Sequence, residues 1–388
     1  MKKKRILVLV ETSRIYGRQI IEGITRYALE HGNWIIFLED RGLEKKIPRL
    51  VQCHYDGIIS RTVFAESRLT TLQVPVVELL GDGVFRSSDI LCDGNRLGVM
   101  ASDYFQSKGL RHFGYFSTGQ SWWSTQFYSA YSEHLATNGF SCLTNPFCRR
   151  KNDASLSLKV TDKTESRILH WLRAIPKPIG LFCPSDSQAV YLINLCQIAE
   201  IAVPHEIAIL GVENNITLCN ATSPTLSSIA VDGHQTGYQA AWLLDRKINK
   251  QVLPKIPILI PPIDVVARVS TDFITVADPD VAKALYFISQ QVLLHITVQD
   301  IADAVDLSPR TLIRKFHESL GHTPEQELHR IRIERAKAIL RNTNLSITKI
   351  GEQIGFTSTE YFVRNFRHTV KMTPKQYRLK FQNEENNQ

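Results

Sequence analysis

The chain has 388 residues, of which 43% are hydrophobic, and a formal net charge of +8. This length accommodates two or three domains with cores of their own, and no apolar run approaches the roughly 18 residues of a membrane span. The seven cysteines form no CxxC motif and no Cys/His ligand spacing, which favours reduced thiols in a cytoplasm over a disulfide framework or a zinc site. No Gly-rich phosphate loop, GxSxG elbow or HExxH motif is present, so we predict a protein that is not an enzyme, without catalytic residues or bound metal.

The N-terminus, MKKKRILVLVETS, combines a basic flank with a short apolar run. The apolar part extends only from Ile6 to Val10, and Glu11 follows at once. This run is too short for the hydrophobic region of a signal peptide and lacks a small-residue cleavage site. We therefore predict that it forms the first strand of a folded cytoplasmic domain.

Residues 1 to about 270 alternate short β-rich runs with helical patterns, which predicts two α/β lobes with parallel sheets built from βαβ units. The predicted strands are Arg5–Val10, Trp34–Leu38, Gly57–Ser60, Val74–Leu79, Phe113–Ser117, Ile179–Phe182, Ile207–Val212 and the extended Ile256–Val269. The predicted helices are Gly17–Glu30, Arg96–Lys108, Gln126–Thr137, Glu165–Ala174, Ala189–Ile201 and Gly237–Arg246. The stretch STDFITVADPD then has the character of a linker, with Asp278 capping a helix that starts at Pro279.

The last hundred residues contain the same pattern twice. Four residues recur 50 positions apart: Phe316, Thr323, Pro324 and Gln326 return as Phe366, Thr373, Pro374 and Gln376. Each block follows two amphipathic stretches separated by a turn, IADAVDLSPRTLIRKF and IGEQIGFTSTEYFVRNF, which predicts helix-turn-helix units at about 298–320 and 347–370. A single unit of this kind also occurs in ordinary helical bundles, but two in register with outward arginines favour DNA binding.

The second helix of each predicted unit has one apolar stripe and one polar face. Leu312, Phe316 and Leu320 mark the buried side of the first, and Phe362 and Phe366 that of the second. The predicted DNA-binding residues are those of the outer faces, namely Arg310, Thr311, Ile313, Arg314 and Lys315, then Thr359, Glu360, Val363 and Arg364. A connecting helix over Glu325–Arg341, carrying His329, Arg332 and Arg335, is predicted to fix their spacing.

The first 270 residues resemble the sugar-binding core of the LacI/GalR regulators, a relative of periplasmic sugar-binding proteins. The resemblance lies in CDGNRLGVMASDYFQSKGLRHFGYFS at 92–117, IGLFCPSDSQAVYLINLCQIAEIAVPHEIAILGVENN at 179–215 and SPTLSSIAVDGHQTGYQAAWLL at 223–244. The tail resembles the AraC/XylS DNA-binding domain, although Asp306 and Lys371-Met372 stand where that family has glycine. These resemblances imply an effector domain at 1–272, a linker at 273–280, a DNA-binding domain at 281–380 and a tail at 381–388.

The resemblance to the LacI/GalR core implies a pocket between the lobes. Its candidate ligand-binding residues are Tyr16, Arg18, Asp93, Trp123, Ser185, Asp186, Glu213 and Asn214. Asp93 and Asp186 precede helical stretches, so helix capping is an alternative role for both, and Trp122 competes with Trp123 for the aromatic face. Phe127 stands where many relatives place a clamping Arg, which makes Arg18 the expected replacement. Glu213 stands where the family commonly has Asp.

Together the two resemblances imply a cytoplasmic, sugar-responsive transcription regulator that binds double-stranded DNA. They favour D-xylose as the effector, activation through RNA polymerase, a homodimer, and neither a cofactor nor a membrane partner. A regulator of another pentose or hexose operon, or a repressor, stays open from the residues alone. A sugar-binding protein without a DNA role explains the core but not the repeated tail.

Overall fold

The structure is a computed structural model that describes residues 3–32, 34–40, 54–61, 73–79, 89–119, 121–145, 162–254, 257–272, 278–291 and 295–386. The chain divides into two compact units. The core unit comprises Met1–Ala199 and Ile209–Thr271, and the C-terminal unit comprises Glu200–Ala208 and Asp272–Gln388. Most of the predicted linker, residues 273–277, lies outside the described residues.

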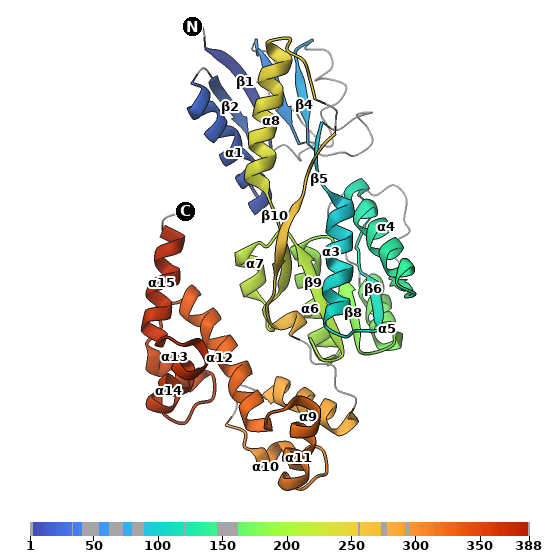
Figure 1. Cartoon of the computed structure of the whole chain (residues 1–388), viewed down its shortest axis with the longest axis vertical. Coiled ribbons are helices and arrows are strands. Elements are labelled where there is room, and N and C mark those ends of the chain that lie inside the picture. The colour runs from blue at the N-terminus through green and yellow to red at the C-terminus, as the bar shows by residue number, and fades with distance from the viewer. Residues whose placement is uncertain are drawn as a thin grey trace. The chain divides into compact units, whose positions relative to one another are not determined.

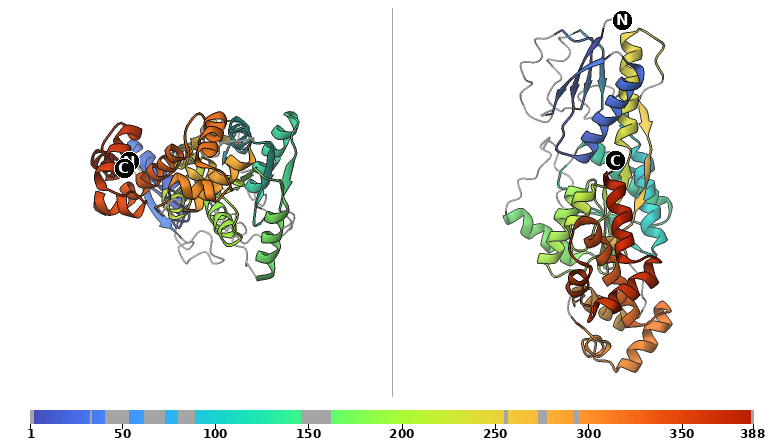
Figure 2. Two further views of the ribbon diagram at one scale, coloured as in Figure 1. Left: turned by 90° about the horizontal axis from the view of Figure 1, so that it is seen from below. Right: turned by 90° about the vertical axis from the view of Figure 1, so that its left-hand side faces the viewer.

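The first lobe of the core unit is a parallel sheet flanked by two long helices. Its strand order is β2-β1-β3-β4, formed by β1 (Lys4–Leu9), β2 (Trp34–Glu39), β3 (Gly57–Ser60) and β4 (Val76–Glu78). Helices α1 (Ile15–His31) and α8 (Gly233–Ile248) lie side by side along this sheet in both side views (Figures 1 and 2). A Cβ on Gly237 would lie 1.9 Å from the carbonyl oxygen of Ile20, so only glycine permits this approach of the helix backbones.

The second lobe is built on a larger sheet with the order β12-β10-β9-β8-β6-β7. Its strands are β6 (His112–Tyr115), β7 (Cys142–Thr144), β8 (Ile179–Phe182), β9 (Ile207–Val212), β10 (Ser227–Val231) and β12 (Pro262–Val266). The pairs β10–β9, β8–β6 and β6–β7 are parallel, whereas β12 runs antiparallel to β10. The helices of this lobe are α3 (Gly94–Ser107), α4 (Trp122–Thr137), α5 (Asp162–Ala174), α6 (Asp186–Ile198) and α7 (Ile216–Ala221).

Two short strands outside these sheets pair with each other. They are β5 (Ile90–Cys92) and β11 (Ile258–Ile260), which run in parallel where the chain passes from one lobe to the other (Figure 1). After β12 the chain ends the core unit with a short 3₁₀ turn at Val269–Thr271.

The C-terminal unit is all-helical in its described part beyond Asp278. Its helices are α9 (Pro279–Gln291), α10 (Val298–Asp303), α11 (Pro309–Leu320), α12 (Pro324–Asn342), α13 (Ile347–Gln353), α14 (Thr359–Val370) and α15 (Pro374–Asn386). The long helix α12 contributes Leu328 to a core formed with α9, α10 and α11, and Ile333 and Leu340 to a second core formed with α13, α14 and α15. Each half of the unit therefore has its own packed interior.

The predicted fold class, a bilobed α/β core followed by an all-α domain with two helix-turn-helix motifs, is confirmed. Strands β3, β8 and β9 have the predicted limits, and α10–α11 and α13–α14 span the predicted 298–320 and 347–370. The carboxylate of Asp278 accepts from the backbone nitrogens of Asp280 and Val281, as expected of a cap before Pro279. The elements that were not predicted are β5, β7, α7, β10, the 3₁₀ turn and α15, and the single predicted strand Ile256–Val269 is divided into β11 and β12.

Candidate functional site

A pocket in the core unit opens where several strands end. Its polar lining consists of Glu11, Arg14, Tyr16, Arg61, Gln126 and Glu213. Glu11, Arg61 and Glu213 each follow a strand closely, after β1, β3 and β9 respectively. The carboxyl ends of parallel strands are where open α/β sheets bind ligands, because the loops there converge.

Two carboxylates and two guanidinium groups face each other across this pocket. Arg61 forms an ion pair with Glu11, and the guanidinium of Arg14 lies 3.6 Å from the carboxylate of Glu213. Burial alone would lower the pKa of Arg61, but Glu11, Tyr16 and Glu213 together raise it above its ordinary value, so the guanidinium stays charged. The four charges cancel, which favours an uncharged, hydrogen-bonding ligand over an anion or a cation.

The Glu11 carboxylate is placed by a close contact between the first strand and the first helix. A Cβ on Gly17 would lie 2.0 Å from the carbonyl oxygen of Glu11, so glycine is required there. Glu11 is only 2% exposed, and its Oε2 has no hydrogen-bond partner among the described residues. Because a buried carboxylate oxygen without a partner is costly, this atom is suited to accept from a ligand hydroxyl.

Tyr16 adds a phenol that stays protonated. Burial raises its pKa well above the usual value, and the nearby Cys92 raises it further. Its hydroxyl lies 3.1 Å from the hydroxyl of Thr236, and the guanidinium of Arg61 lies 5.2 Å from the ring centre. The phenol is therefore fixed in position and keeps its proton across the physiological pH range.

Aromatic rings form another wall of the pocket. Trp122 and Trp123 occupy the first turn of α4, which Ser121 caps by accepting from the backbone nitrogen of Ser124. Phe127, one turn later, packs against Trp123 with ring centres 5.6 Å apart. Both tryptophans line the pocket, so each offers an apolar face to a ligand ring.

Three of the eight ligand-binding residues predicted from sequence line this pocket: Tyr16, Trp123 and Glu213. Arg18, the expected replacement for the missing clamp, lies outside the lining and donates to the carbonyl oxygen of Thr12. Arginines do enter the pocket, but they are Arg14 and Arg61, which sequence reasoning missed.

The other four predicted ligand residues, Asp93, Ser185, Asp186 and Asn214, do not line the pocket. Asp93 caps α3 by accepting from the backbone nitrogen of Arg96, which is the alternative role considered for it. Ser185 is 2% exposed and precedes α6, although its side chain makes no capping bond. Asn214 directs its side chain to Arg268.

Asp186 is fully buried and bonded to the turn that follows β9. Its two oxygens accept from the hydroxyl of Ser228 and the backbone nitrogen of Asn215, each at 2.6 Å. Burial raises its pKa to about 7, although the Ser228 and Asn215 hydrogen bonds oppose that rise. Asp186 therefore holds the turn that follows Glu213 and does not face the pocket.

The first helix-turn-helix unit joins α10 to α11. Asp306 in its turn has a left-handed backbone, with φ +55°, at the place where a glycine was expected. Ser308 caps α11 by accepting from the backbone nitrogen of Thr311, and Leu312 and Phe316 are fully buried. The predicted turn and cap of this unit are confirmed, and the third residue of the predicted stripe, Leu320, is half-buried.

The outer face of α11 presents two exposed arginines. Arg310, Ile313 and Arg314 are exposed, while Thr311 is half-buried against the Ser308 cap. Arg314 forms an exposed i,i+4 ion pair with Glu318 at 2.9 Å. Exposed pairs of this kind contribute little stability. Arg314 can therefore exchange its contact with Glu318 for one with a DNA base or phosphate at low energetic cost.

Lys315 takes a different place from its neighbours on α11. Its ammonium bonds to Asp278 at 2.7 Å and to Asp280 at 2.9 Å, at the N-terminus of α9. The hydrogen bond from Lys315 lowers the pKa of Asp278. Lys315 therefore links α11 to α9. The sequence had predicted it among the DNA-binding residues, but its ammonium is already paired within the C-terminal unit.

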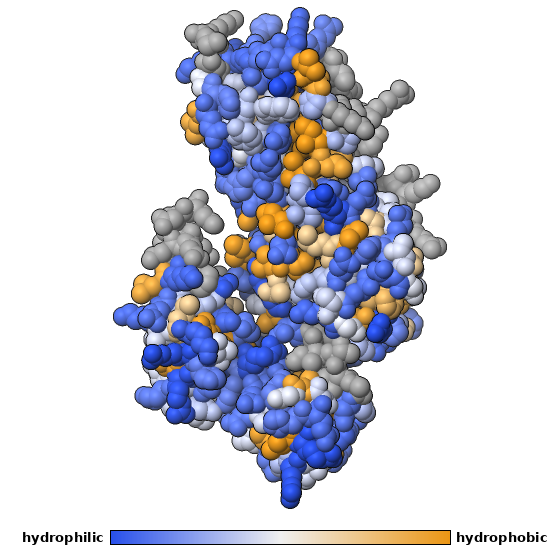
Figure 3. All heavy atoms as spheres, in the orientation of Figure 1, coloured by the Kyte–Doolittle hydropathy of each residue, from blue (hydrophilic) through white to orange (hydrophobic). Residues whose placement is uncertain are grey.

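The second unit joins α13 to α14 with a similar turn. Gly355 has φ +81°, Ser358 accepts from the backbone nitrogen of Tyr361, and Phe362 and Phe366 are fully buried. The four predicted outer residues divide into the exposed Glu360 and Arg364 and the half-buried Thr359 and Val363. On the face shown in Figure 3, charged and polar side chains cover most of the C-terminal unit, with only small apolar patches between them.

The Thr-Pro-x-Gln blocks that revealed the repeat make the same hydrogen bonds twice. The backbone nitrogen of Thr323 donates to Gln326 Oε1 at 2.8 Å, and the backbone nitrogen of Gln326 donates to the Thr323 hydroxyl at 3.2 Å. Thr373 and Gln376 repeat both bonds at 2.9 and 3.2 Å. These reciprocal caps start α12 and α15, so the sequence repeat is a structural repeat.

Neither a metal centre nor a membrane span was found in the described part of the chain. There, no group of three or more His, Cys, Asp or Glu side chains is placed to hold a metal ion. None of the helices described combines the length and the apolar character that crossing a bilayer requires.

Three domain families match successive parts of the chain. Residues 5–89 match the XylR N-terminal domain, residues 102–271 the periplasmic-binding-protein-like domain and residues 301–380 a helix-turn-helix domain. The matched regions correspond to the two lobes of the core unit and to the helical unit that carries α10 to α15.

Similar proteins share this arrangement over nearly the whole chain. The xylose operon regulatory protein of Escherichia coli K12 is 28% identical, with 97% of each chain covered. The protein of the same name from Haemophilus influenzae is 29% identical over 97% of this chain and 98% of its own. A solved structure of the xylose-binding transcription activator XylR superposes with a TM-score of 0.80 at 27% identity, covering 97% of this chain and 98% of that one. The chain is thus a homologue of the xylose operon regulatory proteins, a sugar-responsive transcriptional regulator in which a periplasmic-binding-protein-like core is joined to a helix-turn-helix DNA-binding domain.

Proposed function

We propose that D-xylose is the effector of this regulator and that its binding activates transcription of xylose catabolic and transport genes. The observation that carries this proposal is the electrically balanced pocket, with Glu11 and Glu213 facing Arg14 and Arg61 beside two tryptophans. Carboxylates and guanidinium groups fork to sugar hydroxyls, while indole faces cover the apolar side of a sugar ring. The names of the full-length relatives supply the choice of xylose among small sugars.

The roles of individual pocket groups follow from their hydrogen-bonding capacity. Glu11 and Glu213 accept from ligand hydroxyls, and Glu11 Oε2 is already buried without a partner of its own. Arg14 and Arg61 donate to hydroxyl or ring oxygens, and the protonated phenol of Tyr16 donates or accepts. A sugar phosphate or sugar acid would bring a charge that this neutral set does not balance.

For the output we propose double-stranded operator DNA, read by the exposed faces of α11 and α14, and contact with RNA polymerase. The proposed boundaries are 1–272 for the effector domain, 273–280 for the linker, 281–380 for the DNA-binding domain and 381–388 for the tail. A cytoplasmic homodimer fits this role, because one chain offers only two reading helices and a second chain multiplies the specificity. We assign the protein no enzymatic activity and no cofactor.

We propose that the ligand shifts the equilibrium between two arrangements of the protein, one that binds DNA and one that does not. D-xylose favours the DNA-bound arrangement only to the extent that it binds that arrangement more tightly than the other. Contacts from both lobes to one ligand provide such a difference, since closure of the lobes completes the pocket.

A thermal-shift screen tests the proposal, with tryptophan fluorescence as the readout. All five tryptophans lie in the core unit, so the signal follows the effector domain. D-xylose at 100 times its Kd should stabilise the core by about 2.7 kcal/mol and raise its Tm. D-xylonate and D-xylulose 5-phosphate, as charged relatives, should leave the Tm unchanged. A rise with the charged compounds, or no rise with any neutral sugar, would refute the proposed ligand.

A further inference from the structure

The turn after β9 holds two residues with unusual backbone geometry. Glu213 has φ +104° and Asn214 has φ +49°, and neither is a glycine. Residues other than glycine adopt such angles at an energetic cost, and they persist where surrounding contacts enforce them. The Glu213 side chain faces the pocket, so this strained turn carries one of the proposed ligand groups.

A network of hydrogen bonds enforces the turn from within the core unit. The backbone nitrogens of Asn214 and Asn215 donate to the Ser228 hydroxyl at 2.9 Å and to the Asp186 carboxylate at 2.6 Å. The Ser228 hydroxyl in turn donates to Asp186 at 2.6 Å. Both Asp186 and Ser228 are fully buried, so these contacts are shielded from water.

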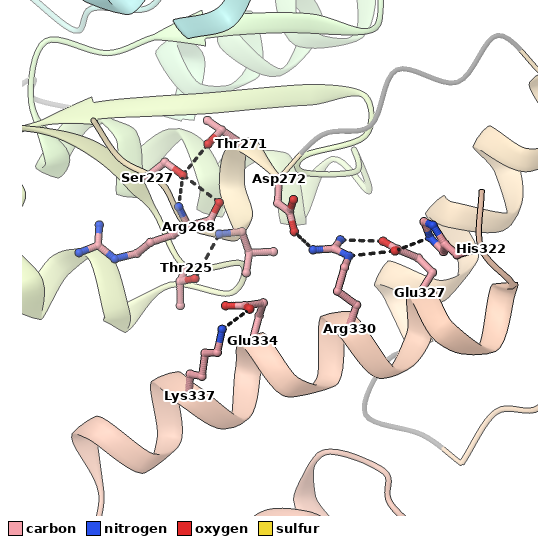
Figure 4. Close-up of polar contacts among 11 residues, drawn as sticks. Thr225, Ser227, Arg268, Thr271, Asp272, His322, Glu327, Arg330, Glu334 and Lys337 are labelled. Atoms are coloured by element: carbon pink, nitrogen blue, oxygen red, sulfur yellow. Dashed lines mark hydrogen bonds and ion pairs between the residues drawn. The ribbon is translucent and has the colours of Figure 1, made fainter. Parts of the chain in front are cut away.

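Arg268, which lies 54 residues after Asn214 in the sequence, contacts the same turn with its side chain. One guanidinium nitrogen donates to Asn214 Oδ1 and another to the carbonyl oxygen of Leu226, each at 2.8 Å. The backbone nitrogen of Arg268 donates to the Ser227 hydroxyl at 2.7 Å, and that hydroxyl is 2.9 Å from the Arg268 carbonyl oxygen (Figure 4). The side chain of Arg268 thus holds the turn, while its backbone is fixed to β10.

The four residues after Arg268 lead directly out of the core unit. Ser270 and Thr271 are buried, and their hydroxyls donate to the carbonyl oxygen of Ile209 and the hydroxyl of Ser227, each at 2.6 Å. The next residue, Asp272, is the point at which the C-terminal unit resumes. A shift of Arg268 is therefore passed along a short, tightly bonded stretch of backbone.

Within the C-terminal unit, Asp272 begins a chain of polar contacts that ends at α11. Its carboxylate forms an ion pair with Arg330, whose guanidinium also bonds to the fully buried Glu327 at 2.6 and 2.9 Å (Figure 4). His322 places one ring nitrogen 3.0 Å from Glu327 and the other 3.0 Å from the carbonyl oxygen of Leu320. Leu320 is the last residue of α11, the first of the two proposed DNA-reading helices.

We propose that Arg268 is the positioning residue through which occupancy of the pocket at Glu213 alters operator binding by α11. This role of Arg268 rests on the proposed function, in which sugar bound in the core unit controls operator binding by the C-terminal unit. A sugar that bonds to Glu213 competes with Arg14 for that carboxylate. The backbone conformation of the strained turn at Glu213 and Asn214 then changes. Because Asn214 accepts from Arg268, the change reaches Asp272 and, through Arg330 and Glu327, the end of α11.

The test measures how strongly the two sites are coupled, using the full-length chain. Operator affinity is determined by fluorescence anisotropy without and with saturating D-xylose, and the ratio of the two Kd values is the coupling ratio. For the unaltered chain this ratio should differ from 1 by about 5- to 150-fold. In Arg268→Met the ratio should fall to within about twofold of 1, while sugar and operator each still bind when measured separately.

Arg246→Met is the matched control. Arg246 also donates one guanidinium hydrogen bond to a backbone carbonyl, that of Val252 at 2.8 Å, but it lies in α8 away from the turn. Its variant should keep the coupling ratio of the unaltered chain. A structural effect common to any lost arginine would lower both ratios and would overturn the specific role of Arg268.

Asp272→Asn provides a second variant that leaves the core unit intact. It removes the ion pair to Arg330 and should lower the coupling ratio in the same way, even if Arg268→Met fails to fold. Sugar affinity of Asp272→Asn should stay that of the unaltered chain. Full coupling in Asp272→Asn or in a folded Arg268→Met would overturn the inference but leave the proposed function standing. Absence of any sugar binding to the unaltered chain would instead refute both.

Discussion

Gly321 and Lys371 hold equivalent places, directly after α11 and α14, and both have a left-handed backbone, with φ +74° and +61°. In each case the backbone nitrogen donates to the carbonyl oxygen four residues earlier, His317 or Arg367, and closes the helix. Glycine adopts this geometry without a steric penalty, whereas lysine does not. The second unit therefore carries a cost at its helix end that the first avoids.

Replacing Lys371 by glycine should stabilise the C-terminal unit by about 1 kcal/mol, because the left-handed cap no longer strains a Cβ. The free energy of unfolding, measured by circular dichroism in urea, checks the change. Gly321→Lys is the mirror control and should destabilise by a similar amount. Equal stability of Lys371→Gly and the unaltered chain would show that the cap is not strained.

Replacing Arg314 by alanine should weaken operator binding by about 10- to 100-fold while leaving sugar affinity unchanged, since a base or phosphate contact is lost. Arg26→Ala is a matched control. Arg26 is also an exposed helical arginine with an i,i+4 glutamate partner, Glu30, at 2.8 Å, against 2.9 Å for Arg314 and Glu318. Anisotropy titrations in which both variants lose the same affinity would exclude a DNA-reading role for Arg314.

Arg14 and Arg18 lie one helical turn apart at the start of α1, but only Arg14 lines the pocket. Arg14→Met should lower sugar affinity by about 10-fold or more, because a charge-assisted hydrogen bond is worth roughly 1.5–3 kcal/mol. Arg18→Met removes only a bond to the Thr12 carbonyl oxygen and should bind sugar as the unaltered chain does. Quenching of tryptophan fluorescence reports both affinities, and the reverse order of effects would place the ligand elsewhere.

Asp186 should make the stability of the core unit depend on pH. Its pKa in the folded state is about 7, above the ordinary 3.8, so between these values the folded chain holds a proton that the unfolded chain releases. The free energy of unfolding should therefore fall as pH rises from about 4 to 7, by up to roughly 1.4 kcal/mol per unit from this group.

Asp186→Asn removes the titrating group. Between pH 5 and pH 7 the free energy of unfolding of this variant should therefore fall less than that of the unaltered chain. Urea unfolding at several pH values, followed by tryptophan fluorescence, measures the difference. Parallel stability curves for the two proteins would mean that Asp186 titrates in its ordinary range when folded.

The repeated tail could be predicted from sequence almost residue by residue. Ser308, Pro309 and the stripe of Leu312 and Phe316 are local signals, since caps, helix starts and buried faces depend on residues within a few positions. Lys315 was placed on the wrong side of this pattern because its partners, Asp278 and Asp280, lie more than 30 residues earlier. Local periodicity does not contain that information.

The pocket was harder to predict because it assembles from distant strand ends. Glu11 and Arg61 form an ion pair although they lie 50 residues apart. A signal was present, since each directly follows a predicted strand, Arg5–Val10 or Gly57–Ser60, at the end where side chains of a parallel sheet converge. The resemblance implied Arg18 instead, but Arg14 is the arginine of this helix start that lines the pocket.

An operator titration tests whether sugar bound in the core unit controls DNA binding by the C-terminal unit. A labelled duplex from the promoter of xylose genes in the same genome is titrated with the full-length chain, with and without saturating D-xylose. D-xylose should tighten operator binding by about 5- to 150-fold. Identical binding curves in the presence and absence of every sugar that binds the core would contradict it.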